Sequence, residues 1–372
     1  MCEIHGERGR ERSGAKAIPV TEAVGMVLAH DITEIRKEDF KGRAFRKGHV
    51  VTREDVEHLQ RLGKDHLFVL HIADDEMHED DAAYALASAL KGEGVLLEGE
   101  PKEGKINLVA ARDGLLKIDR DILASFNMLG EVMCATLHTN TVVKKGQVIA
   151  GTRAIPLVVK KAIIDEAVAI AERAGAVIEV KEMRKVKAGV VITGNEVYYG
   201  RIQDAFAPVV TRKIEGYNGE IVGIYYAPDD ESLIEARLRE LLEAGADLLI
   251  TTGGMSVDPD DVTRFAIRNL GASGLTYGSA VLPGAMFLVA YLERGQGEQE
   301  RGNGNASSFH GEVPLLGIPA CGMYHKTTIF DLVLPRVLAG ERVGRRELAE
   351  LGHGGLCLNC KECRYPVCPF GK

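Results

Sequence analysis

The stretch Leu248–Asp261, which reads LLITTGGMSVDPDD, decides how the C-terminal half of this chain folds. Its apolar start, through Thr252, has the composition of a buried strand. The pair Gly253-Gly254 ends that strand, and Val262–Leu270 has the spacing of a helix. Glycines between a strand and a helix N-terminus let backbone N–H groups approach an anion. The same turn is also compatible with a plain connection capped by aspartates.

Strands and helices alternate on both sides of this stretch, over residues 186–345. We expect strands at Ala188–Ile192, Glu220–Tyr226, Asp247–Thr252, Gly278–Leu282, Met286–Leu292 and Pro314–Ile318. The expected helices are Ala205–Gly216, Asp229–Ala244, Val262–Leu270 and Lys326–Leu338. This alternation predicts a doubly wound, three-layer α/β/α domain with a mostly parallel sheet.

The remaining residues predict four further regions. Residues 1–16 are expected to be a disordered leader, and residues 17–75 an α+β region. That region has one helix starting at Pro19–Glu22 and another after a capping box at Thr52–Asp55. Residues 76–185 predict an inserted, β-rich domain with helical ends, its strands near 106–110, 115–118, 131–137, 141–143 and 148–150. Residues 346–372 form a cysteine-rich, metal-binding tail.

Composition narrows the class of protein. A chain of 372 residues predicts more than one domain, and a net charge of −8 offers no broad basic surface for nucleic acid. No apolar run is long enough to span a membrane, and the polar start predicts no secretory signal. We therefore expect a cytoplasmic protein that binds neither nucleic acid nor membrane. Its seven cysteines then indicate thiols or metal ligands rather than disulfides.

Three polar loops follow the expected parallel strands. They are Thr193–Glu196, the pair Asp229-Asp230, and the turn from Gly253 to Asp261. The carboxyl ends of parallel strands meet at one crevice, so Glu196, Asp261 and one of the paired aspartates should converge there. Such carboxylates suit Mg²⁺ bound together with a substrate phosphate. The alternative for the pair is a helix cap, which contributes about 1 kcal/mol.

These motifs together resemble a known family. The TGNE at 193–196, Asp204, the PDD at 228–230 and the DLLITTGG-x-S at 247–256 are similar to the molybdopterin-binding domain of molybdenum insertases and molybdopterin adenylyltransferases. The stretches Ala23–Ile32 and Phe45–Leu70 resemble N-terminal pieces of the insertase. The resemblance implies a three-layer α/β domain over residues 186–345. Its implied ligand is molybdopterin, the adenylylated form or the finished molybdenum cofactor.

The resemblance also implies roles for individual residues. Metal and substrate handling, and hence catalysis, would fall to Glu196, Asp229 and Asp261. The implied cofactor-binding residues are Thr193, Gly194, Asp204, Asp230, Thr252, Gly253, Gly254 and Ser256. The implied partners are molybdoenzymes or other proteins of cofactor biosynthesis, together with a homodimer.

The chain departs from the family pattern at several loops. Asn195 stands where the family has Asp, and Asp258-Pro259 replaces a Gly-Asp pair. Ala285 replaces a lysine that would meet an anion, and Cys321 lies where the insertase has an Asn-Pro pair. Three interpretations follow. One is a transferase that inserts molybdate with Mg²⁺ and releases AMP. Another is a non-catalytic carrier or sensor of the cofactor. A nucleotide pyrophosphatase on the same scaffold is a third.

The C-terminal tail, CLNCKECRYPVCPFGK, carries the metal prediction. Its ligands would be Cys357, Cys360, Cys363 and Cys368. The first three repeat the C-x2-C-x2-C spacing of ferredoxin-like iron–sulfur ligation, and a proline directly follows the fourth, as in that pattern. The spacing between the third and fourth cysteines is one residue longer than in that pattern. Four thiolates also suit tetrahedral zinc. An unmetallated redox tail is the third alternative.

Overall fold

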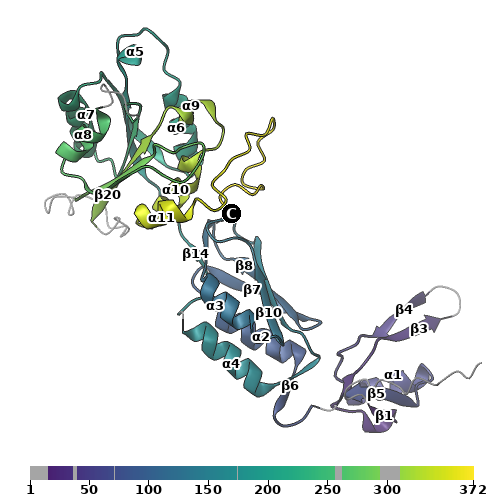
Figure 1. Ribbon diagram of the computed structural model, residues 1–372. Helices are drawn as coiled ribbons and strands as arrows, with labels where there is room; N and C mark the ends of the chain where they lie inside the picture. The colour runs from purple at the N-terminus through teal and green to yellow at the C-terminus, as the bar shows by residue number, and fades with distance from the viewer. Residues whose placement is uncertain (1–15, 37–39, 71, 174, 256–261, 294–310) are drawn as a thin grey trace, which may run out of the picture. The chain divides into compact units, whose positions relative to one another are not determined.

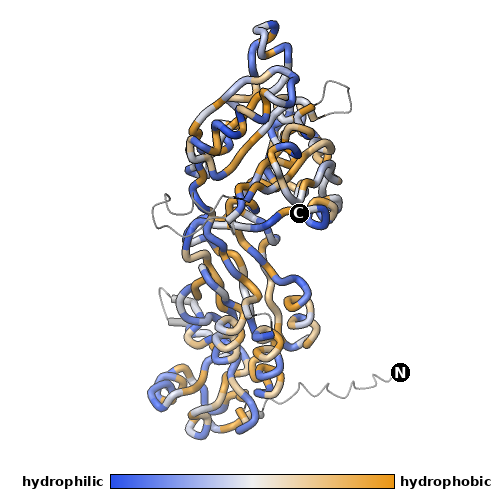
Figure 2. Tube along the Cα trace, turned by 90° about the vertical axis from the view of Figure 1, so that its left-hand side faces the viewer, coloured by the Kyte–Doolittle hydropathy of each residue, from blue (hydrophilic) through white to orange (hydrophobic). Residues whose placement is uncertain are grey.

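The computed structural model describes residues 16–36, 40–70, 72–173, 175–255, 262–293 and 311–372. The chain divides into two compact units (Figure 1). Unit 1 comprises residues 1–111, 118–137 and 145–179, and unit 2 comprises residues 112–117, 138–144 and 180–372. Apolar segments run through the interior of each unit (Figure 2). Within the described ranges, no helix is long and apolar enough to cross a membrane.

Unit 1 begins with a small sheet of order β1-β5-β2, formed by Lys16–Pro19, His66–Leu70 and Val27–Leu28. The hairpin of β3 (Ile32–Arg36) and β4 (Phe40–Phe45) follows, and α1 (Arg53–Arg61) starts directly after Thr52, as predicted. The helix expected from Pro19 is wrong. Only a 3-10 turn forms at Val20–Glu22, because Gly25 turns the chain with φ +82° and β2 then pairs with β5.

The rest of unit 1 is an antiparallel sheet with helices on one face. Its order is β10-β12-β8-β7, formed by Val132–Thr136, Val148–Ala154, Lys105–Ala110 and Val95–Lys102. Helix α2 (Glu79–Leu90) packs against β8 and β12, and α4 (Lys161–Glu172) packs against α2. The short strands β6 (Glu76–His78) and β13 (Val158–Lys160) pair beside them. Helix α3 (Arg120–Asn127) was not predicted; Asp119 caps it by accepting from the N–H groups of Asp121 and Ile122.

Unit 2 is built on a six-stranded sheet of order β16-β15-β17-β20-β19-β18. The strands, in that order, are Glu220–Ala227, Lys187–Thr193, Leu248–Thr252, Glu312–Ile318, Leu288–Glu293 and Ser273–Tyr277. The first four run parallel, and β19 runs antiparallel to both of its neighbours. The predicted mostly parallel α/β sheet is therefore confirmed. The strand expected at Gly278–Leu282 is wrong: β18 ends at Tyr277 because Gly278 has φ +87°.

Helices cover both faces of this sheet (Figure 1). On one face, α6 (Phe206–Glu215) and α10 (Ile329–Leu338) pack on side chains such as Val190 and Ile250. On the other, α7 (Glu231–Glu243) and α8 (Thr263–Asn269) pack on Val191 and Leu249. The alternation of side chains along each strand thus supplies two apolar cores, as a three-layer arrangement requires.

Shorter elements complete unit 2. They are α5 (Asn195–Tyr198), α9 (Cys321–Tyr324) and α11 (Arg345–Glu350). A small sheet of order β11-β9-β14 is formed by Val142–Val143, Gly114–Ile118 and Ile178–Lys181.

Candidate functional site

The surroundings of the turn after β17 require glycine at both Gly253 and Gly254. Gly253 has φ +84° and Gly254 has φ +57°. A methyl group on Gly253 would lie closer than 3.0 Å to the backbone oxygen of Thr193, and one on Gly254 closer than 3.0 Å to the hydroxyl of Thr263. Only glycine allows the backbone to approach β15 and α8 so closely. The turn therefore places half-buried main chain, without side chains, at the carboxyl end of β17.

Threonine hydroxyls lie directly beneath this turn. Thr193 Oγ1 donates to the carbonyl oxygen of Thr252 at 3.0 Å and lies 3.2 Å from Thr263 Oγ1. The Thr252 hydroxyl is fully buried and has no hydrogen-bond partner within the described ranges. Because buried polar groups are nearly always paired, this hydroxyl is available to a further group.

Two carboxylates lie at the neighbouring loops. Asn195 N–H donates to Asp229 Oδ2 at 3.0 Å, and Asp229 N–H donates to Asn195 Oδ1 at 3.4 Å. This reciprocal pair joins the loops that follow β15 and β16. Glu196 is exposed, and its carboxylate folds over Gly194, where an added methyl group would come within 2.8 Å of Oε1. Gly194 has φ +135°, a conformation that favours glycine.

The other two predicted aspartates cap helices. Asp204 accepts from the N–H groups of Phe206 at 2.8 Å and Ala207 at 3.0 Å, at the start of α6. Asp230 accepts from Leu233 N–H at 2.9 Å, at the start of α7. Tyr226 donates its hydroxyl to Asp204 at 3.3 Å, and burial together with the Asp204 charge raises the pKa of that phenol. Of the pair Asp229-Asp230, it is therefore Asp230 that caps the following helix.

The structure brings most of the predicted residues to the carboxyl edge of the parallel strands. Thr193 ends β15, and Gly194 and Glu196 follow that strand. Asp229 follows β16, and the double glycine follows β17. Ser256 and Asp261 lie outside the described residues. Across the described ranges, no group of three or more His, Cys, Asp or Glu side chains is arranged to hold a metal ion.

Sequence reasoning missed several residues at this edge. Thr263 contributes a further buried hydroxyl, and Tyr277 donates its hydroxyl to the carbonyl of Met255, the residue after the double glycine. Arg264 lies over the Tyr277 ring, with its guanidinium carbon 5.7 Å from the ring centroid. No sequence motif marks these contacts, since they join α8 and β18 to the turn through tertiary packing.

The tail cysteines are not gathered into one cluster. Cys357 and Cys368 are half-buried against the core of unit 2, whereas Cys360 and Cys363 are exposed. The Cys363 thiol lies 3.2 Å from Thr327 Oγ1. Hydrogen bonds from Thr327 and from the Tyr365 backbone hold the pKa of Cys363 below its ordinary value. The four tail thiols are free, and the contacts of Cys363 lower its pKa.

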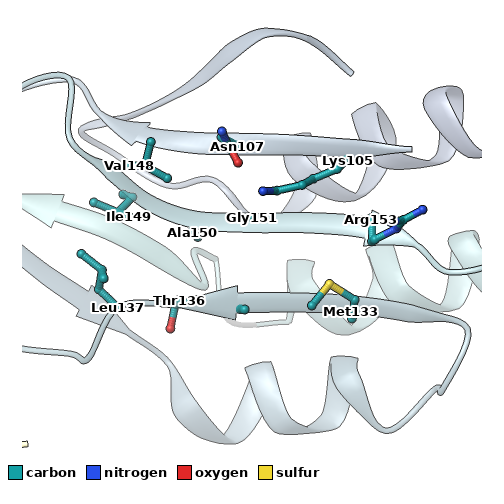
Figure 3. Close-up of a pocket in the computed structure, with 11 residues that line it drawn as sticks. Lys105, Asn107, Met133, Thr136, Leu137, Val148, Ile149, Ala150, Gly151 and Arg153 are labelled. Atoms are coloured by element: carbon teal, nitrogen blue, oxygen red, sulfur yellow. The ribbon is translucent and has the colours of Figure 1, made fainter. Parts of the chain in front are cut away.

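Two pockets of the surface lie away from this edge. A pocket of about 390 Å³ lies on the open face of the unit 1 sheet, between Lys105, Asn107, Met133, Leu137, Val148 and Arg153 (Figure 3). A second, of about 230 Å³, lies in unit 2 between Tyr217, Arg336, Tyr365 and Phe370. Neither contains the residues of the sheet edge. The candidate site is therefore identified by its backbone turn and hydroxyls rather than by concavity.

Residues 189–339 match the family described as a probable molybdopterin binding domain, and residues 17–71 match a domain of unknown function. A CinA-like protein of Mycobacterium avium is 40% identical over 89 residues, which are 23% of this chain and 20% of that protein. A CinA-like protein of Mycobacterium tuberculosis is 40% identical over 77 residues, 21% and 18% respectively. The chain spans about a fifth of the length of these curated relatives.

Solved structures were also similar in part. The tungsten cofactor synthesizing protein MoaB from Pyrococcus furiosus gives a TM-score of 0.33 at 18% identity, over 44% of this chain and 100% of that one. The protein CinA from Thermoplasma acidophilum gives a TM-score of 0.30 at 15% identity, over 38% and 92%. At these TM-scores the likeness carries no inference about function.

Proposed function

Residues 189–339 of this chain belong to the molybdopterin-binding domain family, and from that premise we propose that the chain binds a molybdopterin-type ligand at the carboxyl edge of β15 and β17. The ligand would be molybdopterin, its adenylylated form or the finished cofactor, used in molybdenum cofactor biosynthesis. The observation that supports this proposal best is the Gly253-Gly254 turn, where the main chain is half-buried and no side chain can be added.

The chemistry of the edge suits a phosphorylated ligand. Backbone N–H groups of a glycine turn can donate to phosphate oxygens, because no Cβ keeps the anion away. The buried Thr252 hydroxyl adds a donor that has no described partner. The ligand's pterin ring would then lie toward the loops after β15 and β16, which Asn195 and Asp229 hold together.

A catalytic step is the finer proposal. Glu196 is exposed and has no hydrogen-bond partner for its carboxylate among the described residues, and Asp229 accepts from Asn195 N–H through Oδ2. Carboxylate oxygens are ligands that Mg²⁺ prefers, so these two residues, with Asp261, would hold that ion. When bound, it would stabilise charge on the departing AMP during molybdate insertion.

A non-catalytic carrier or sensor is the second candidate. It is favoured by Asp204 and Asp230, whose carboxylates are already engaged as helix caps. It is favoured also by Asn195, whose amide replaces a family carboxylate and bonds to Asp229. On this proposal the site retains its ligand without transforming it.

Mass spectrometry of the purified chain tests binding. A pterin recovered in stoichiometric amount supports the proposal, whereas a nucleotide alone would favour the pyrophosphatase alternative. To test catalysis, release of AMP from adenylylated molybdopterin is followed with molybdate and saturating Mg²⁺. The Asp261→Asn variant should abolish release, whereas the matched change Glu243→Gln, on α7, should leave it unchanged. No release by the wild type would leave the carrier as the function.

The tail supports a separate proposal, that its thiols bind zinc or an iron–sulfur cluster. The spacing of the four cysteines in the sequence favours this proposal. In the structure the thiols are not gathered at one point, so the tail must rearrange before three thiolates can share an ion. Zinc and iron are measured in anaerobically purified protein. Loss of the metal in the Cys360→Ser variant but not in Cys321→Ser would support a tail site. A metal-free wild type would leave the redox alternative.

Proteins of cofactor biosynthesis or molybdoenzymes are the partners that this function would require. A homodimer is proposed with them. Light scattering of the purified chain measures its mass directly.

A further inference from the structure

Arg264 is an arginine with an unused buried donor. Its Nε is buried and has no hydrogen-bond acceptor within the described ranges. It forms no ion pair with any described carboxylate, unlike Arg184, Arg336 and Arg342, which pair with Asp247, Glu341 and Glu312. Buried donors without a partner are rare because each costs roughly 1–3 kcal/mol. Such a group indicates an acceptor that the described residues do not supply.

The guanidinium of Arg264 is held in a defined place. Its central carbon lies 4.9 Å from the ring centroid of Phe265 and 5.7 Å from that of Tyr277. Aromatic faces at these distances attract a cation and restrict the plane of the guanidinium. The arginine is therefore oriented before any ligand arrives, so that less side-chain entropy is lost on binding.

The same residues connect Arg264 to the double glycine. Tyr277 donates its hydroxyl to the carbonyl of Met255, which follows Gly254 directly. Thr263, the residue before the arginine, has its hydroxyl 3.2 Å from that of Thr193. Both β17 and β18 end at this edge, because β18 runs antiparallel to β19 and β19 antiparallel to β20. Arg264 thus belongs to the edge that carries the glycine turn.

We propose that Arg264 is the residue that recognises the phosphate of the ligand, and this inference rests on the proposed function. A guanidinium offers several donors in one plane and can bind two phosphate oxygens at once. The backbone of the glycine turn would hold the phosphate from one side and Arg264 from the other. Selectivity for the phosphorylated pterin over its dephosphorylated form would then come from this side chain.

Two other cations of unit 2 are already engaged by protein groups. Lys213 is paired with Asp331, and Arg345 donates to the carbonyl oxygens of Tyr277 and Gly278. Arg201 is exposed and lies 5.6 Å from the ring centroid of Tyr199, in the loop after β15. Unlike Arg264, it has no buried donor that lacks an acceptor. Arg201 therefore serves as a comparison in the test.

The test compares two ligands and several variants. The probes are the oxidised, fluorescent pterin that retains its phosphate and the same pterin after removal of the phosphate. Arg264→Gln should weaken binding of the phosphorylated probe by about 10- to 100-fold, as expected for a lost charged hydrogen bond. Binding of the dephosphorylated probe should change less than about twofold, because that probe has no phosphate for the arginine to meet. Arg268→Gln, on the same helix and exposed, should alter neither.

Arg264→Lys provides a second variant in case the glutamine variant does not fold. It keeps the charge but loses the planar fork, so it should lose an intermediate part of the preference for phosphate. Thermal unfolding of each variant confirms that it is folded. Unchanged preference in folded Arg264→Gln, or in Arg264→Lys if only that variant folds, overturns the inference. So does an equal loss for Arg201→Gln or Arg268→Gln.

Failure of the proposed function gives a different result. If the wild type binds neither pterin, that function fails, and calorimetric titration with inorganic pyrophosphate then tests the arginine alone. Pyrophosphate binding that is lost in Arg264→Gln but kept in Arg268→Gln would still support an anion contact. Absence of pyrophosphate binding by the wild type would overturn both.

Discussion

The change Gly253→Ala tests the idea that the double glycine is required by close approach and not only by its backbone angle. At φ +84° a non-glycine residue is strained, which costs about 1–2 kcal/mol. The added methyl group would also lie within 3.0 Å of the Thr193 carbonyl oxygen, which is main chain and cannot rotate away. Such overpacking costs about 1–3 kcal/mol. We expect unit 2 to lose roughly 2–5 kcal/mol of stability in total.

Gly245→Ala is the matched control for that change. Gly245 ends the α7 connection with φ +90°, and nothing lies within 4 Å of the position that its methyl group would take. Its cost should therefore be the strain alone, about 1–2 kcal/mol. Hydrogen exchange of the β17 amides reports the local opening free energy even if the two units unfold separately. Equal losses for the two alanines would refute the close-approach argument.

Three further changes probe the capping and buried carboxylates. Asp204→Ala should lower the stability of unit 2 by about 1 kcal/mol, with Asp204→Asn nearer wild type, because two helix N–H groups lose their acceptor; thermal unfolding measures this. Burial raises the pKa of Glu341, but hydrogen bonds from Arg336 and Lys117 outweigh burial and hold the pKa below 4.5. The ionised Glu341 carboxylate therefore stabilises unit 2, and this contribution is lost as the pH falls below 4.5. Glu341→Gln should flatten that part of the pH–stability curve for unit 2. Burial raises the pKa of Glu79 above 4.5 despite Arg153, so unit 1 should lose stability as pH rises through the interval above 4.5; an unchanged slope in Glu79→Gln would contradict this.

The elements of unit 2 could be predicted where an apolar run had a clear end. Strands β15 and β17 have apolar interiors, Ala188–Ile192 and Leu248–Ile250, between polar residues, and the sequence places both strands within one residue. Strand β18 was missed because its sequence, SGLTY, buries little and contains a glycine. The false strand at Gly278–Leu282 has the apolar pair Val281-Leu282, but the Ser279 hydroxyl bonds to the Gly284 carbonyl and the segment forms a turn.

The candidate site could be predicted in part. The glycines and Thr193 are local signals, since a strand that ends in such residues turns in a limited number of ways. Neighbouring aspartates give no such signal. Only the contacts in the folded structure show that Asp230 caps α7, by accepting from Leu233 N–H, whereas Asp229 accepts from Asn195 N–H in the neighbouring loop. Arg264 required tertiary information, because Tyr277 meets it from a strand that the sequence did not reveal.

The division of the chain affects whether unit 2 can be prepared separately. The polypeptide passes from one unit to the other after residues 111, 117, 137, 144 and 179. A fragment starting at residue 180 would lack β9 and β11, which form one sheet with β14. Proteolytic cleavage after residue 179 would leave two segments of unit 2, residues 112–117 and 138–144, on the N-terminal fragment. Unit 2 as a whole therefore cannot be obtained by one cut in the chain.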